Sequence, residues 1–129
     1  YTILLEQDST DALDMNNYAY SLCERPTSDM EYALELAQEA VRIEPENPAY
    51  LDTIGWIYFK LNHFQEALVF LEKSNKLDSL DTVILEHLGD VYKKTGNYSK
   101  AKNKYSRILE LNPEANAVQE KLKQLRHNE

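Results

Sequence analysis

A short pattern of residues recurs thirty-four positions further along this chain. The run L-x-x-I-G-x-x-Y begins at Leu51, and L-x-x-L-G-x-x-Y begins at Leu85. Three alanines, Ala33, Ala67 and Ala101, keep the same step. A fixed period of about 20 to 50 residues is typical of stacked supersecondary units. The chain is therefore predicted to be a repeat protein.

Within one period, the apolar residues have the spacing of helices. At about 100° per residue, Leu51, Ile54 and Tyr58 share one helix face, and residues 64–71 contain a second such face. Asn62 lies between the two runs, and asparagine often caps the start of a helix. Each period is thus predicted to be an antiparallel helical hairpin with a very short turn.

Two glycines lie in the middle of predicted helices, where glycine costs about 1 kcal/mol relative to alanine. They are Gly55 and Gly89. We expect close approach of the partner helix to compensate, with Ala67 and Ala101 as the small residues across the contact. A larger side chain in that seam should overpack it by about 1–3 kcal/mol.

The register divides the chain, taken as one domain over 1–129, into five segments. They are 1–9 as the end of a preceding repeat, 12–45, 48–79 and 82–113 as three repeats, and 114–129 as a capping helix. This division implies a turn at residues 9–11, a first helix from about 12 to 24, and a chain that begins inside a longer array.

Capping signals mark two helix starts. Ser28 and Glu31 form an S-x-x-E capping box, which predicts a helix from about 29 to 43. Asn47 followed by Pro48 predicts the next start, because proline at the first helical position gives up an amide that has no partner there. In the first helix, we expect Met15 and Tyr18 to point inward, together with Ala19 and Leu22.

The last predicted helix has few apolar residues. Val118, Leu122 and Leu125 are expected to face inward, and Lys121 is expected to belong to the polar remainder. A terminal repeat needs a polar outer face, so this segment is predicted to cap the array.

Charge and composition exclude several classes of function. The formal net charge of −8 argues against binding of nucleic acid or of an anionic membrane surface, since both need clustered lysine and arginine. The acidic excess falls in residues 1–64, whereas residues 65–129 are nearly balanced. No apolar run approaches the roughly 18 residues of a membrane span, so no membrane insertion of this segment is expected.

Residue sets typical of catalysis or metal binding are missing from the sequence. The one cysteine, Cys23, excludes an intramolecular disulfide, and three glycines leave no phosphate-binding loop. Glu86, His87 and Asp90 could hold a metal, but no second ligand cluster supports this, so a solvated helix surface is favoured. We predict no enzyme, no cofactor and no metal.

These repeated motifs resemble those of tetratricopeptide-repeat (TPR) proteins over essentially the whole chain. The two copies are near the pattern W-x-x-L-G-x-x-Y, and Pro45 and Pro113 close two of three repeats. Residues 16–20, 52–56 and 85–90 are similar to bacterial TPR proteins, including envelope proteins. The resemblance implies an all-α fold, a right-handed α-solenoid of helix hairpins with a C-terminal cap. Its concave face, lined by the first helix of each pair, would bind a peptide or partner protein.

Helical angles indicate which side chains would line that face. Trp56 lies about 150° from the inward direction of its helix, and Asp52 and Phe59 lie about 90–110° from it. With their equivalents in the neighbouring repeats, the candidate partner-binding residues are Asn16, Tyr20, Asp52, Trp56, Phe59, Glu86 and Asp90. In the alternative interpretation, Trp56 and Phe59 pack against neighbouring first helices.

Some TPR domains hold a C-terminal carboxylate on this face with a clamp of lysine, arginine and asparagine. The resemblance places Asn16, Tyr20, Thr53, Glu86 and Asp90 at the clamp positions. The clamp is thus absent, and acids replace its cations. A partner segment with basic and apolar side chains is expected instead, and its binding should weaken with added salt.

Two functions remain open at this stage. The first is a non-enzymatic scaffold that holds a peptide or protein, with Tyr20, Trp56 and Phe59 as apolar anchors. The second is a structural segment that only stacks on further repeats or on a copy of itself, as a homo-oligomer. The compartment is also open, with the cytoplasm and the bacterial envelope both compatible with the sequence.

Overall fold

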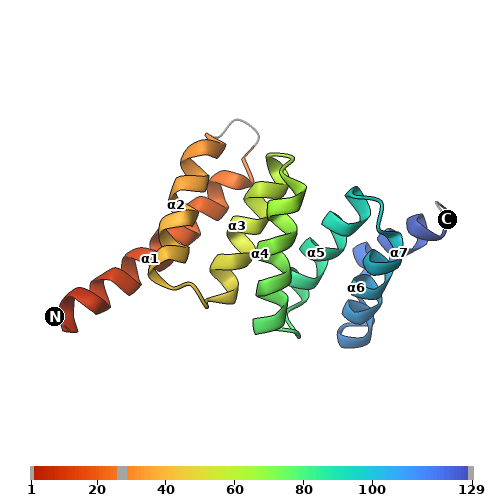
Figure 1. The fold of residues 1–129 in the computed structure, drawn as a ribbon. Coiled ribbons are helices and arrows are strands. Elements are labelled where there is room, and N and C mark those ends of the chain that lie inside the picture. The colour runs from red at the N-terminus through yellow and green to blue at the C-terminus, as the bar shows by residue number, and fades with distance from the viewer. Residues whose placement is uncertain (1, 26–28, 128–129) are drawn as a thin grey trace. The chain divides into compact units, whose positions relative to one another are not determined.

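The computed structural model describes residues 2–25 and 29–127, with side chains over 11–25 and 29–125. All regular structure in these ranges is helical, as predicted (Figure 1). The helices are α1 (Thr2–Cys23), α2 (Met30–Ile43), α3 (Pro48–Lys60), α4 (Phe64–Leu77), α5 (Thr82–Lys94), α6 (Tyr98–Leu111) and α7 (Asn116–His127). They form two compact units, one up to Leu77 and the other from Asp78 onward. The repeat boundaries and the single domain stay predictions.

The first unit consists of two helical hairpins, α1/α2 and α3/α4. Helix α3 packs against its partner α4 and also against α2 and α1. The main core cluster joins small residues of α1 and α2, such as Ala19 and Ala37, to Ile54 and Ile57 of α3. Ala12, Ala40 and Tyr50 form a second cluster with partly buried neighbours. This arrangement buries α3 on several sides at once.

The second unit is the hairpin α5/α6 with α7 packed against α6. Leu88 and Val91 of α5 are buried, as are Tyr105 and Ile108 of α6. Helix α7 buries Val118 and Leu125, and Leu122 is half-buried. The three predicted inward residues of the last helix are therefore turned toward the protein.

Both mid-helix glycines lie where the partner helix comes very close. A Cβ at Gly55 would stand 2.7 Å from Cγ of Leu71 and 3.3 Å from the carbonyl oxygen of Ala67. At Gly89, a Cβ would stand 2.7 Å from Cε1 of Tyr105. The expected close approach is confirmed. The nearest atoms belong to Leu71 and Tyr105 rather than to the alanines, which are fully buried beside them.

The short turns within the hairpins contain a residue in the left-handed region. Asn62 has φ 65° after α3, and Gly96, thirty-four residues later, has φ 85° after α5. The amide of His63 donates to the carbonyl of Tyr58 at 2.8 Å, which closes the end of α3. Asn62 therefore ends a helix rather than capping the start of the next. Asparagine and glycine are the residues that most readily adopt this conformation.

Two predictions about the first helix are wrong. Helix α1 continues from Thr2 to Cys23 without the turn predicted at residues 9–11. Those residues are serine, threonine and aspartate, and α1 contains neither glycine nor proline to break it. Tyr18, predicted inward, is 47% exposed and meets the edge of Tyr32. The buried stripe of α1 includes Asn16 instead.

The helix caps agree in part with the sequence. Asn47 is the N-cap of α3, with Pro48 in the first turn, as predicted. The N-cap of α2 is Asp29, whose carboxylate accepts from the amide of Tyr32 at 3.1 Å. The predicted capping residue Ser28 lies outside the described residues.

Candidate functional site

In the first unit, the structure brings together five of the predicted site residues. Asn16 and Tyr20 lie on α1, while Asp52, Trp56 and Phe59 lie on α3, which packs beside α1. We call these five residues the α1/α3 face. The other two predicted residues belong to the second unit.

Trp56 is part of the core. It is only 8% exposed and belongs to the main cluster with Ala19 and Cys23 of α1. These surroundings agree with the alternative interpretation, in which Trp56 packs against a neighbouring first helix. Phe59 stacks on it with ring centroids 4.7 Å apart and is half-buried. Lys60 Nζ lies 5.2 Å from the Trp56 ring.

The polar residues of the α1/α3 face lie in an acidic environment. Asn16 and Asp52 are 7% and 6% exposed. Burial raises the pKa of Tyr20 to about 12. The pKa is raised further by the charge of Glu24, by a hydrogen bond between Tyr20 and Glu24, and by the charge of Asp52. Tyr20 is therefore a neutral phenol at physiological pH. Asn16 Oδ1 is buried and accepts no hydrogen bond from the described residues.

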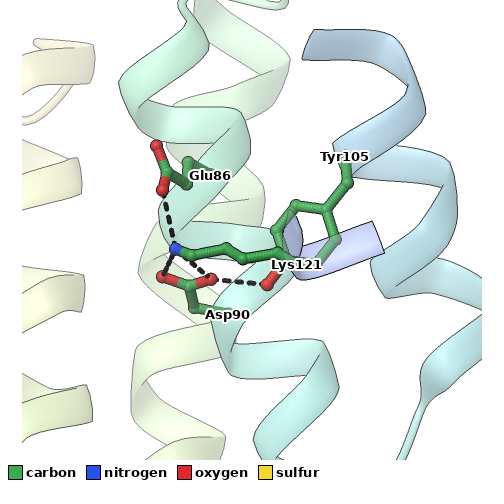
Figure 2. A network of polar contacts seen from close by, with 4 residues as sticks. All are labelled: Glu86, Asp90, Tyr105 and Lys121. Carbon is green, nitrogen blue, oxygen red and sulfur yellow. Dashed lines mark hydrogen bonds and ion pairs between the residues drawn. The ribbon is translucent and has the colours of Figure 1, made fainter. Parts of the chain in front are cut away.

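In the second unit, the two predicted acids are bound to α7 (Figure 2). Lys121 Nζ lies 2.6 Å from Glu86 Oε2, and 3.0 and 3.1 Å from the two carboxylate oxygens of Asp90. The hydroxyl of Tyr105 donates to Asp90 Oδ1, and the Lys121 ammonium lies 5.9 Å from the Tyr105 ring. We call Glu86, Asp90 and Tyr105 the lysine seat.

The pKa values in the lysine seat reflect its charges. Burial alone lowers the pKa of Lys121, but its hydrogen bonds to Glu86 and Asp90 outweigh burial and raise it overall. Burial also raises the pKa of Tyr105, with the hydrogen bond to Asp90 as the next cause. The ammonium and the neutral phenol are thus both stabilised at neutral pH.

Sequence reasoning missed Lys121, although the repeat period contained a signal. Counting back in steps of thirty-four from Lys121 leads to His87 and then to Thr53. Both of these side chains are buried, with 7% and 3% exposed. Continuing the register into the last helix would have marked Lys121 as an inward position.

The described residues contain no cluster of metal-binding side chains. No group of three or more histidine, cysteine, aspartate or glutamate side chains converges among them as a metal site requires. Burial raises the pKa of the Cys23 thiol to about 12, so this thiol is protonated at neutral pH. None of the described helices combines the length and apolar character of a membrane span.

Comparison with known proteins identifies the family. Two tetratricopeptide repeat family models match residues 49–79 and 83–115. The TPR repeat-containing protein MJ1428 of Methanocaldococcus jannaschii is 33% identical over 106 residues, which are 81% of this chain and 18% of that protein. The TPR repeat-containing protein PA4667 of Pseudomonas aeruginosa is 29% identical over 67% of this chain and 14% of its own length. The chain belongs to the tetratricopeptide-repeat family and spans less than a fifth of these relatives.

Solved structures share the fold. The first TPR of Spaghetti (RPAP3), bound to the HSP90 peptide SRMEEVD, superposes with a TM-score of 0.84 at 20% identity, over 93% of this chain and 94% of that one. The Arabidopsis OM64 TPR domain gives a TM-score of 0.82 at 19% identity, over 95% and 99% of the two chains. The chain thus has the fold of a TPR domain.

Proposed function

We propose that this chain is a non-enzymatic protein-interaction scaffold, and that a peptide or partner protein binds to its α1/α3 face. The observation that carries the proposal is the pair Tyr20 and Phe59. Both are half-buried and rest on the core cluster around Trp56. Aromatic side chains held on a rigid base lose little freedom on binding and are frequent in interface hot spots.

The charges of the α1/α3 face favour a partner segment with basic and apolar side chains. Asp52 and the nearby Glu24 both act on the pKa of Tyr20. Lys60 Nζ lies 3.8 Å from Glu24 Oε2, so two acids and one lysine surround the aromatic surface and leave it a net negative charge. Such complementarity governs association rate and specificity more than affinity. The peptide SRMEEVD of the structural neighbour is acidic and ends in a carboxylate, so we expect this chain not to bind it.

The proposal can be tested by selecting peptides of about twelve residues from a random displayed library. The selected peptides should be enriched in lysine or arginine together with aliphatic or aromatic residues. Their affinity, measured by fluorescence anisotropy, should fall at least about tenfold for Phe59→Ala and decline with added salt. Val69→Ala on α4 is the matched control, because Val69 is 64% exposed. Equal loss in both variants, or no enriched peptide at all, would contradict the proposal.

The alternative function is a structural segment that recognises no ligand or associates only with itself. It is favoured by the internal contacts of the candidate residues, since Asn16, Asp52 and Trp56 are nearly buried. A mass measurement in solution over a hundredfold range of concentration tests it. A rising mass with no selected peptide supports the alternative, whereas a monomer that binds peptides through Phe59 excludes it.

A further inference from the structure

The ammonium of Lys121 has the surroundings of a bound ligand. Its three N–H donors meet three carboxylate oxygens, one from Glu86 and two from Asp90. The side chains of Lys121 and Asp90 are 29% and 20% exposed, and that of Glu86 is 35% exposed. The site is therefore closed enough to select for charge and open enough to exchange its occupant.

The lysine seat is built on α5 and α6 alone. Tyr105 is fully buried and lies against Gly89, which fixes its ring. Its hydroxyl donates to Asp90 Oδ1 and so orients that carboxylate (Figure 2). Two adjacent acids with an aromatic ring beside them form a receptor for a cation. Nothing in this receptor comes from α7, which supplies only the lysine.

Over residues 116–125, whose side chains the structure describes, helix α7 is attached through a small apolar face. It packs against α6 through the buried Val118 and Leu125, with Leu122 half-buried. Gln119 and Lys123, which correspond in register to the buried Leu85 and Gly89, are exposed. A short polar helix with so small an apolar face gains little from its own burial. The ionic contact of Lys121 is thus a substantial part of its attachment.

We propose that the lysine seat is a docking site for a lysine-bearing amphipathic helix, and that α7 occupies it until a partner helix displaces α7. Because α7 now occupies the lysine seat, the partner helix should resemble α7. The partner helix carries aliphatic residues seven positions apart, like Val118 and Leu125, with a lysine three positions after the first. This spacing places all three side chains on one face. The inference concerns the second unit and adds a second docking surface to the proposed scaffold.

The probe for this site is a fluorescent synthetic peptide that copies residues 114–129, added to the full chain. In the wild-type chain, α7 competes from within, at a high effective concentration, so binding should be weak. Lys121→Gln removes the internal lysine and should tighten peptide binding at least about tenfold. Lys123→Gln, an exposed neighbour on the same helix, is the matched control and should bind the peptide as the wild type does.

Two further measurements decide whether the lysine seat is the site. A peptide with glutamine in place of its lysine at position 121 should bind the Lys121→Gln chain at least about tenfold more weakly. Adding the Glu86→Gln and Asp90→Asn changes to the Lys121→Gln chain should weaken binding of the original peptide to the same extent, at least about tenfold. Circular dichroism checks that each variant remains helical. Equal affinity for the two peptides, or no binding to the Lys121→Gln chain at millimolar concentration, overturns the proposal.

Displacement of α7 by the peptide should be detectable by amide hydrogen exchange. When the peptide binds the wild-type chain, the amides of α7 should lose protection while those of α3 keep theirs. Peptide binding without faster exchange in α7 would place the peptide elsewhere and overturn the proposal. Phe59→Ala should leave these results unchanged, so the two proposed surfaces succeed or fail separately.

Discussion

Tyr105 packs directly on the backbone of Gly89, and a Cβ at that position would stand 2.7 Å from its ring. In the first unit, Leu71 stands at the same distance from a Cβ built on Gly55. Leu71 and Tyr105 are separated by one period of thirty-four residues. Glycine therefore recurs because the partner helix leaves no room for a Cβ at either position. An aliphatic side chain makes the close contact in the first unit, and an aromatic ring makes it in the second.

Gly89→Ala should lower the free energy of unfolding by about 1–3 kcal/mol. Alanine gains about 1 kcal/mol of helix propensity, but the buried Tyr105 ring has to shift to make room for the added methyl group. Urea denaturation followed by circular dichroism measures the change. Lys94→Ala, at an exposed site on the same helix, serves as the control. An unchanged or raised midpoint for Gly89→Ala would show that the seam has room.

The two left-handed turn residues should respond oppositely to substitution. Asn62→Gly should be neutral or stabilising by up to about 1 kcal/mol, because glycine adopts positive φ without steric strain. Gly96→Ala should destabilise the chain by about 1–2 kcal/mol, because alanine is strained at a φ of 85°. No atom lies within 4 Å of the added Cβ, so the loss should come from the backbone conformation alone. Thermal unfolding of both variants checks this pair. A neutral Gly96→Ala would contradict the assignment of backbone strain.

Substitutions at Trp56 and Phe59 should differ in how much they lower the free energy of unfolding. Trp56→Ala empties part of the main core cluster and should cost about 3–5 kcal/mol of unfolding free energy. Phe59→Ala, at a half-buried position, should cost about 1–2 kcal/mol and leave the chain folded. Urea denaturation compares them directly. A Trp56→Ala variant as stable as the Phe59→Ala variant would contradict the core position of Trp56.

The chain should lose stability in alkaline solution. Burial raises the pKa of Cys23 from 9.0 to about 12, with the charge of Glu24 adding to the effect. The unfolded chain therefore releases this proton first, so the contribution of Cys23 to stability is constant below about pH 8 and falls as pH rises from about 9 toward 12. Cys23→Ala should remove about 1–2 kcal/mol of the fall measured between about pH 8 and pH 10.5 by urea denaturation. Tyr20 supplies a further part of the fall, because its pKa is also raised to about 12. An identical fall in wild type and variant would refute the role of Cys23.

Much of the fold could be predicted from spacing alone. Four predicted features depend on contacts within one helix or one hairpin. They are the period of thirty-four residues, the helical hairpins, the close approach at Gly55 and Gly89, and the Asn47 cap. The same holds for the three inward residues of α7. The predicted turn at residues 9–11 failed because polar residues permit a turn but do not require one.

The candidate site was harder to predict, because its residues depend on contacts between hairpins. The angle assigned to Trp56 assumed one buried face, whereas all residues from Tyr50 to Ile57 are buried in a helix that packs against three others. Lys121 lies thirty-five residues from Glu86 in sequence, and no spacing within a single helix links them.

Local hydrogen bonding and side-chain spacing are properties of short segments, so the sequence alone indicated the helical hairpins and the period of thirty-four residues, although not the unbroken course of α1. The side on which each helix is buried, and the partner that each charge meets, depend on how hairpins stack. That stacking is a balance of apolar burial and ion pairing between distant segments. Only the tertiary structure therefore decided that Trp56 belongs to the core and that Lys121 fills the lysine seat.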